Sequence, residues 1–403
     1  MDAMPPRPNQ PVYLDNQATT RCDPRVVAAM LPYFLEEYGN PHSVEHAMGQ
    51  RAEQAVEQAR AHVAALLGVD AREVIFTSGA TEANNIAIKG AARFAASMDG
   101  SRRRVVTVQT EHKCVIEAVR DLAAEGFEPV LLPVGNDGLL DPDRLRAALA
   151  IPTLLVSVMA VNNETGVVQD IASLAAIAKD SAALFHTDLA QAAGKIPLHL
   201  IRDKVDLASV SGHKLYGPKG VGALFVRRRP RVRLAPLFSG GGQERGLRSG
   251  TLPTPLIVGL GEACRLANLE MGQEVTRVAD LRATLLERLT GAIPGLRVNG
   301  SMTARIAGNL NLTFPGAPAA ELMRAIPDLC VSTGSACSSA EIEPSYVLRA
   351  MGLSDDEAAR TLRIGIGRFT SAADIDYAAA SLAAAALAST RPAGTASRNL
   401  AEA

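Results

Sequence analysis

The chain has 403 residues, of which 47% are hydrophobic and 21% are charged, a composition typical of a globular protein with a large buried core. Its formal net charge of -1 gives no reason to expect nucleic acid or an anionic membrane as the main partner. No run approaches the roughly 18 consecutive apolar residues that a membrane-spanning helix needs.

Residues 1–11 are polar and proline-rich, and they lack the apolar core of a signal peptide. The five cysteines are odd in number and form no CxxC pair. Both features favour a reducing, cytoplasmic compartment over a disulfide-forming one.

In the first two thirds of the chain, short apolar runs alternate with amphipathic segments. The runs predict strands over residues 74–76, 104–108, 154–160, 183–187 and 206–210, with helices near 82–96, 115–125 and 171–180. Strands separated by helices indicate a mainly parallel sheet with helices on both faces, an α/β architecture.

The pattern changes near residue 260. A long helix is expected over 258–289, then strands at 296–298, 309–313 and 329–332, a helix at 319–325 and an alanine-rich helix at 378–388. We predict a large domain over 16–260, a smaller α+β domain from 1–15 and 261–388, and a disordered tail over 389–403.

Polar residues follow the predicted strands at the point where each strand ends. In parallel sheets, ligands bind outside the carboxyl ends of the strands, so one crevice should collect these residues. They are Thr81, His112, Asn163, Asp188, His213 and Lys214.

Lys214 and Asp188 together suit pyridoxal phosphate chemistry. The lysine would hold the cofactor covalently, and the aspartate would keep the pyridine nitrogen protonated. Gln191 could bond the phenolic oxygen, and His112 could stack on the ring or carry a proton. Taken singly, Gln191 could equally be a surface residue and His112 a structural one, so the prediction rests on their clustering.

Residues 78–81, Ser-Gly-Ala-Thr, lie between a predicted strand and a predicted helix. Backbone N–H groups at such a helix start can bind a phosphate group. An ordinary helix cap is the alternative interpretation. Ser211 and His213 would add donors to the same crevice and favour the phosphate site.

Cys337 lies in a segment of small residues, Thr333 to Ser339, that could bring a thiol to the cofactor. A buried, inert cysteine is the alternative, and Cys330, between Leu329 and Val331, fits it better. Arg363 could bind a substrate carboxylate through two hydrogen bonds, with Arg368 as its rival. The basic run 227–233 is interpreted as a solvated turn.

From about residue 13 to residue 377 the chain resembles the NifS/IscS-like cysteine desulfurases, which have the class V aminotransferase fold, an aspartate aminotransferase-like fold of pyridoxal phosphate enzymes. The matching segments are residues 13–16, 18–20, 76–81, 110–113, 161–170, 211–214, 216–220, 248–251, 334–337, 343–349 and 367–370.

This resemblance implies a role for each matched position. Lys214 would carry the cofactor, with His112 over its ring, Asp188 at its nitrogen and Gln191 at its oxygen. The phosphate would be bound by Ala80, Thr81, Ser211, His213 and, from the other subunit of a homodimer, Thr251. Asn163 and Arg363 would hold the carboxylate of L-cysteine, and the Cys337 thiolate would take its sulfur as a persulfide, leaving L-alanine.

The resemblance also implies a sulfur-acceptor protein, either an iron–sulfur scaffold or another carrier, and leaves open whether Cys337 transiently ligates an iron–sulfur cluster. Thr187 and Ala190 depart from the family pattern, as does the tail after Leu387. A selenocysteine lyase, a class V aminotransferase and a non-enzymatic interaction platform are the alternatives.

Overall fold

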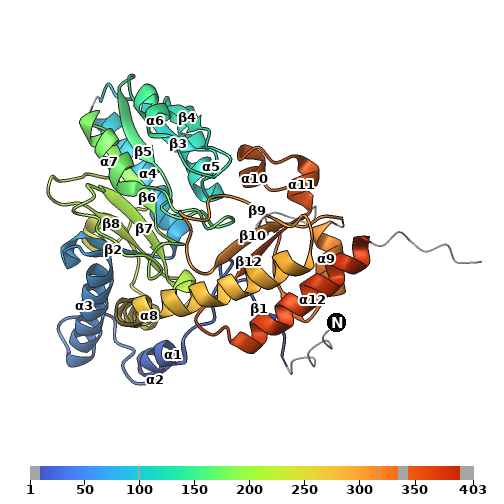
Figure 1. Cartoon of the computed structure of the whole chain (residues 1–403). Coiled ribbons are helices and arrows are strands. Elements are labelled where there is room, and N and C mark those ends of the chain that lie inside the picture. The colour runs from blue at the N-terminus through green and yellow to red at the C-terminus, as the bar shows by residue number, and fades with distance from the viewer. Residues whose placement is uncertain (1–9, 99, 317, 335–343, 391–403) are drawn as a thin grey trace, which may run out of the picture.

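The computed structural model describes residues 10–98, 100–316, 318–334 and 344–390. Within them, the main sheet has seven strands in the order β2–β8–β7–β6–β5–β3–β4 (Figure 1). Neighbouring strands are parallel from β7 to β4, whereas β8 is antiparallel to both β7 and β2. The strands are β2 Val74–Thr77, β3 Arg104–Val108, β4 Glu128–Leu132, β5 Thr153–Ser157, β6 Leu184–Asp188, β7 Leu207–Ser211 and β8 Gly222–Val226.

Successive side chains of the sheet enter different cores, because side chains alternate between the two faces of a strand. Phe76 packs in one core with residues of α3 (Ala47–Leu67) and α7 (Ile171–Asp180). Ile75 packs on the opposite face with α4 (Ala80–Ser97) and α5 (Lys113–Asp121). The sheet is therefore covered on both faces, and the α/β prediction is confirmed.

A second core forms around a three-stranded antiparallel sheet in the order β12–β10–β9 and a parallel pair, β1–β11. These strands are β1 Val12–Tyr13, β9 Arg297–Val298, β10 Asn309–Thr313, β11 Leu329–Cys330 and β12 Thr361–Gly365. Two helices, α9 (Ala319–Ala325) and α12 (Ala372–Thr390), pack in this core.

The long helix α8 (Thr254–Ala292) runs between the two cores (Figure 1). Ile257 and Leu260 belong to the core of the main sheet, whereas Leu285 and Leu289 belong to the second core. The predicted boundary at residue 260 thus lies inside a continuous helix. We propose that the chain divides into a large and a small domain along the lines expected, with the separate cores as support.

The remaining elements are short and lie mostly at the edges of these two bodies. They are α1 Pro24–Met30, α2 Pro32–Leu35, α6 Pro142–Ala148, α10 Tyr346–Ala350, α11 Asp355–Ala359, and the 3₁₀ turns η1 Ala71–Glu73, η2 Leu122–Glu125, η3 Gly212–Lys214 and η4 Glu244–Gly246. Of the predicted tail, residues 389 and 390 complete α12, and the rest lies outside the described residues.

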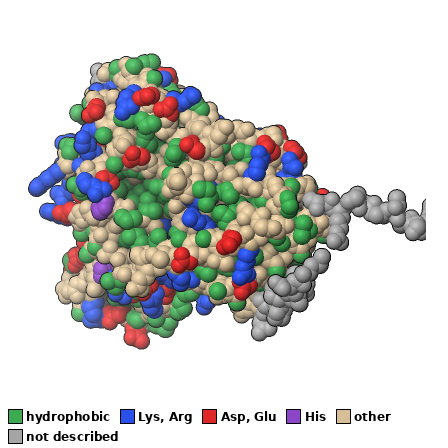
Figure 2. Space-filling model, in the orientation of Figure 1, with side chains coloured by type: hydrophobic (Ala, Val, Ile, Leu, Met, Phe, Trp, Pro, Cys, Tyr) green, Lys and Arg blue, Asp and Glu red, His purple; other side chains and the backbone are tan. Residues whose placement is uncertain are grey.

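Basic and acidic side chains are interspersed over the face seen in Figure 2, as the nearly neutral net charge suggests. Among the described helices, none combines the length and apolar character needed to cross a bilayer.

Candidate active site

The ends of β6 and β7 bring the predicted aspartate and lysine to the same edge of the main sheet. Asp188 is the last residue of β6, and Ser211 is the last residue of β7. The 3₁₀ turn η3 follows β7 at once and carries His213 and Lys214. Since β6 and β7 are parallel neighbours, their carboxyl ends lie at one edge of the sheet.

The amino terminus of α4 faces this edge with an open first turn. Gly79 is the N-cap, and no side chain caps the helix, so the alternative of a Ser or Thr cap does not apply here. A methyl group added to Gly79 would lie 3.9 Å from the Ser211 hydroxyl oxygen. Uncapped N–H groups next to a buried hydroxyl form an anion-binding site of the kind a phosphate group occupies.

The Asp188 carboxylate is held rigidly below the crevice. It accepts hydrogen bonds from Asn84 Nδ2 at 2.7 Å and from the Ala190 backbone N–H at 2.8 Å, and it is 4% exposed. Asn84 comes from α4, so the helix that forms the anion site also orients the aspartate. Ala190, one of the two departures from the family pattern, contributes through its backbone alone.

The Lys214 ammonium group is turned toward the N-terminal segment. Its Nζ donates to the backbone carbonyls of Gln17 at 2.6 Å and Ala18 at 2.7 Å. Gln191 Nε2 donates to the same Gln17 carbonyl at 2.9 Å. One carbonyl oxygen therefore joins two of the predicted site residues.

His112 is the N-cap of α5. Its Nδ1 accepts the Cys114 backbone N–H, so a neutral ring carries its proton on Nε2. Burial lowers the pKa of His112, and the Lys214 cation lowers it further, whereas the Asp188 carboxylate opposes the shift. The imidazole is thus neutral near pH 7, with Nδ1 engaged by the Cys114 N–H and the Nε2–H available as a donor.

A cavity of about 570 Å³ opens beside His112. That volume suits a small ligand. His112, Asn163, Glu164, Gly334 and Tyr346 are among its lining residues. The structure therefore brings two predicted site residues, His112 and Asn163, to one hollow.

Arg363 lies in the middle of β12, 3% exposed, and reaches toward Asn163. One terminal nitrogen donates to the Asn163 carbonyl at 3.0 Å, and the other pairs with Asp15 at 2.7 Å. Among the described residues, Arg363 Nε and Asn163 Oδ1 are buried without a hydrogen-bond partner. A buried donor without a partner is costly, and a substrate carboxylate would supply the acceptor that Arg363 Nε lacks.

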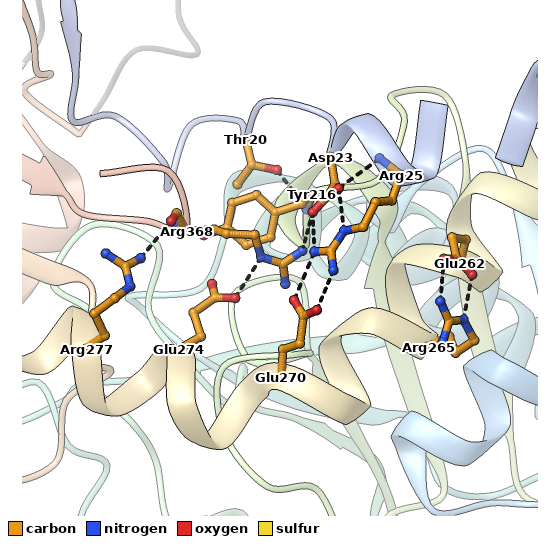
Figure 3. Close-up of polar contacts among 10 residues, drawn as sticks. All are labelled: Thr20, Asp23, Arg25, Tyr216, Glu262, Arg265, Glu270, Glu274, Arg277 and Arg368. Atoms are coloured by element: carbon orange, nitrogen blue, oxygen red, sulfur yellow. Dashed lines mark hydrogen bonds and ion pairs between the residues drawn. The ribbon is translucent and has the colours of Figure 1, made fainter. Parts of the chain in front are cut away.

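Arg368, the alternative to Arg363 as a carboxylate-binding residue, instead makes contacts within the protein (Figure 3). It pairs with Asp23 at 2.9 Å and Glu274 at 2.8 Å, and its guanidinium carbon lies 4.3 Å from the centre of the Tyr216 ring. Figure 3 shows these groups converging from the N-terminal segment, from α8 and from the loop after β12. Arg368 thereby has a structural role, because it connects these segments.

Three predictions remain without a structural description. Cys337, both as the sulfur acceptor and as a transient cluster ligand, lies outside the described residues. Thr251 is exposed in this single chain, and its predicted contact with a phosphate group would be made in the other subunit of a dimer.

The cysteines among the described residues are free thiols. Burial raises the pKa of Cys114 to about 12, in keeping with an inert role.

Four buried or partly buried groups near the site were not singled out from the sequence: Asn84, Glu111, Glu164 and Lys195. Glu111 is fully buried, and desolvation, followed by the nearby Asp188 charge, raises its pKa well above the usual range. The Glu164 carboxylate accepts the Ser345 hydroxyl at 2.5 Å and lies against Gly334. The sequence does not single them out, because their surroundings come from contacts in the fold and not from a local pattern.

Comparison with known proteins decides the family. The sequence model described as "Aminotransferase class-V" matches residues 12–378. A protein named "Cysteine desulfurase IscS" from Rickettsia felis is 52% identical over 371 residues, which are 92% of this chain and 90% of that protein. The chain belongs to the cysteine desulfurases of the class V aminotransferase family.

Further relatives agree with this assignment. The human protein named "Cysteine desulfurase" is 53% identical over 91% of this chain and 80% of its own length. A solved structure titled "NIFS-LIKE PROTEIN" has a TM-score of 0.85 at 35% identity, covering 93% of this chain and 99% of that one. Another, titled "SspA in complex with cysteine", has a TM-score of 0.79 at 36% identity, covering 89% and 99%. The predicted family and fold are confirmed.

Enzymes of this family use pyridoxal phosphate, and the residues present fit that group. The open first turn of α4 and the Ser211 hydroxyl suit the phosphate, and the Asp188 carboxylate suits a protonated ring nitrogen. Asp188, the Lys214 ammonium group and the His112 imidazole are close enough to influence one another electrostatically. The residues present therefore fit the phosphate and the ring nitrogen of the cofactor.

Proposed function

We propose that the chain removes sulfur from L-cysteine, releasing L-alanine and leaving the sulfur as a persulfide on Cys337. Identity above 50% to proteins named cysteine desulfurase supports this activity over that of an aminotransferase. The observation that carries the substrate assignment is the buried, unpartnered Nε of Arg363 beside Asn163.

Bound pyridoxal phosphate supplies an electron sink that stabilises negative charge at the substrate α-carbon. Lys214 would hold the cofactor, with Ala80, Thr81, Ser211 and His213 around its phosphate. Asp188 would pair with the ring nitrogen, His112 would cover the ring, and Gln191 would donate to the phenolic oxygen.

The chain's own groups then handle the substrate and its protons. Arg363 and Asn163 would orient the amino acid through its carboxylate. The Lys214 amine, once the substrate has displaced it, would take the α-proton and return a proton to carbon. His112, neutral near pH 7, would donate a hydrogen bond or a proton through its Nε2–H, a role that its Nδ1 contact with the Cys114 N–H supports.

Sulfur leaves by nucleophilic attack of a thiolate. The Cys337 thiolate would form a bond to the substrate sulfur while the bond between that sulfur and the β-carbon breaks. The electron pair of the broken bond stays with the carbon fragment, which takes up protons and departs as L-alanine. Atoms and electrons balance, because one thiol and one molecule of L-cysteine give one persulfide and one molecule of L-alanine.

The natural partners of such a protein are a second copy of the chain and a sulfur acceptor. We infer a homodimer in which Thr251 completes the phosphate site of the other subunit. We also infer an acceptor protein in iron–sulfur cluster assembly or thiolation, and a reducing, cytoplasmic compartment in which thiols persist. Transient ligation of a cluster by Cys337 belongs to the same proposal.

The Cys337→Ser variant tests the sulfur-transfer step. We expect it to bind cofactor with an unchanged spectrum but to lose persulfide formation by at least about a hundredfold, because a hydroxyl group cannot replace the thiolate nucleophile. Mass spectrometry of the protein after addition of L-cysteine, with L-alanine assayed in parallel, measures this. Lys214→Ala serves as the control and should lose covalently held cofactor instead. Undiminished L-alanine release by Cys337→Ser would contradict the proposal.

A further inference from the structure

The orientation of the Gln191 side-chain amide is determined by its two neighbours. Gln17 presents a backbone carbonyl, which can only accept, so the atom facing it at 2.9 Å is the amide nitrogen. The amide oxygen must then point the opposite way, toward Lys195 Nζ, which lies 2.9 Å from it. Gln191 is 3% exposed, so water does not compete freely for these contacts.

This arrangement leaves one hydrogen of the Gln191 amide nitrogen for another acceptor. A side-chain amide has two N–H donors, and the Gln17 carbonyl uses one of them. Under the proposed function, the second donor would face the phenolic oxygen of pyridoxal phosphate. A flipped amide would instead place its oxygen against that negatively charged oxygen and repel it.

We propose that Lys195 is a positioning residue that holds Gln191 as a donor toward the cofactor and strengthens that donor by polarising the amide. The inference rests on the proposed function, because the acceptor it serves is the bound cofactor. Hydrogen bonds in a chain reinforce one another, so a cation on the amide oxygen makes the amide N–H groups stronger donors.

The surroundings of Lys195 indicate that this side chain does more than fill space in the interior. Lys195 is partly buried, and burial, followed by the Lys214 charge, lowers its pKa to about 7. Glu274 of α8 opposes this shift, and Arg363 of β12 adds to it. Tyr216 and Glu274 line the same small cavity as Lys195. An apolar side chain would occupy this position without the desolvation cost, but it could not donate a hydrogen bond to the amide oxygen.

The test is a pH titration of the visible absorbance of the cofactor bound to the whole enzyme. The pKa of the bound cofactor should rise if the phenolic oxygen loses a hydrogen-bond donor, and it should also rise if a nearby cation is removed. We expect Lys195→Met to raise the titration midpoint by roughly half a unit to one unit, a threefold to tenfold change in proton affinity. Lys195→Arg, which keeps a cationic donor, should restore the midpoint.

A double-variant cycle separates positioning from charge acting at a distance. In a Gln191→Ala background, Lys195→Met should shift the midpoint less than half as far as it does in the wild type. Equal shifts in both backgrounds, or no shift in either, would overturn the inference. Lys89→Met, which removes a lysine paired with Asp121 on the surface, is the matched control and should leave the midpoint unchanged.

Thermal unfolding of each variant without cofactor shows whether it folds. If Lys195→Met fails to fold, Lys195→Gln provides the same comparison with a neutral donor, and a wild-type midpoint in that variant would also overturn the role of the charge. A wild-type chain that binds no pyridoxal phosphate would refute the proposed function itself, which is a separate outcome.

Discussion

Arg363 and Arg368 lie five residues apart in one strand-like run, and their surroundings separate them. Arg368 has carboxylates on two of its nitrogens and a tyrosine ring beneath it. Arg363 keeps a buried Nε without a partner among the described residues. An arginine with an unpartnered buried donor is suited to a ligand, whereas one with all its partners in the protein stabilises the fold.

Arg363→Gln should therefore impair substrate binding more than cofactor binding. We expect the KM for L-cysteine to rise by about tenfold to a hundredfold, since a charge-assisted hydrogen bond contributes about 1.5–3 kcal/mol. Steady-state kinetics and cofactor titration measure the two effects. Arg368→Gln is the paired variant and should mainly lower the melting temperature. The opposite division of effects between the two variants would reverse their assigned roles.

Some residues of the candidate site could be predicted from the sequence, and others could not. Asp188 and Lys214 could be predicted because each follows an apolar run that ends at the sheet edge. Lys195 and Glu164 could not, since their importance comes from contacts with Gln191 and Ser345 and not from any local pattern. The choice of Arg363 over Arg368 came from family resemblance alone, because spacing along a strand does not reveal which neighbours a side chain meets.

At the scale of elements, the predicted strands lie within three residues of observed ones, but β1, β4 and β8 were not predicted, and the starts of α8 and α12 were placed too late. The expected strand 309–313 matches β10, because its apolar and polar residues alternate clearly. The last helix was expected to begin at residue 378 but begins at Ala372. Ser371 and Asp374 explain the difference, since they exchange hydrogen bonds that cap the first turn.

The packing of α4 against the sheet depends on two glycines that face one another. A methyl group at Gly222, the first residue of β8, would lie 2.7 Å from the α-carbon of Gly79, closer than atoms pack. The same methyl group would also overlap the Val210 carbonyl oxygen, so the strand β7 or the start of α4 would have to shift. The phosphate site is therefore sensitive to a single carbon atom in the neighbouring strand.

Gly222→Ala should weaken cofactor binding by about tenfold, because overpacking of this kind costs roughly 1–3 kcal/mol. Titration of the apoprotein with pyridoxal phosphate, followed by absorbance, measures the affinity. Gly272→Ala is a suitable control, because a methyl group there would meet nothing within 4 Å. Equal affinities for the two variants would show that the helix start tolerates the shift.

For the molecule as a whole, the ion-pair network of Figure 3 connects parts that are distant in sequence. Asp23 lies just before α1, Glu270 and Glu274 come from α8, and Arg368 follows β12. Hydrogen bonds from Arg25, in the first place, and from Arg368 hold the pKa of Asp23 below its usual range. An acid with a lowered pKa in the folded state stabilises the fold at pH values above its unfolded pKa, and this contribution disappears as pH falls.

Asp23→Asn should lower the free energy of unfolding by about 3 kcal/mol at neutral pH, because the buried Arg368 guanidinium group then loses one of its two carboxylate partners. The difference between the variant and the wild type should shrink as pH falls below about 4, because Asp23 of the unfolded wild-type chain then takes up a proton while the folded chain still resists protonation. Denaturant unfolding at several pH values measures this. A difference that stays constant down to acidic pH would show that the Asp23 charge contributes nothing.

The pairing of β1 with β11 has a consequence for how the protein is made. The ribosome releases Val12 and Tyr13 early, but their partners, Leu329 and Cys330, leave the exit tunnel only near the end of synthesis. The lysine side of the crevice can assemble on the nascent chain, whereas the arginine side must wait for translation to finish. A half-made polypeptide could thus acquire the means to hold a cofactor before it can recognise an amino acid.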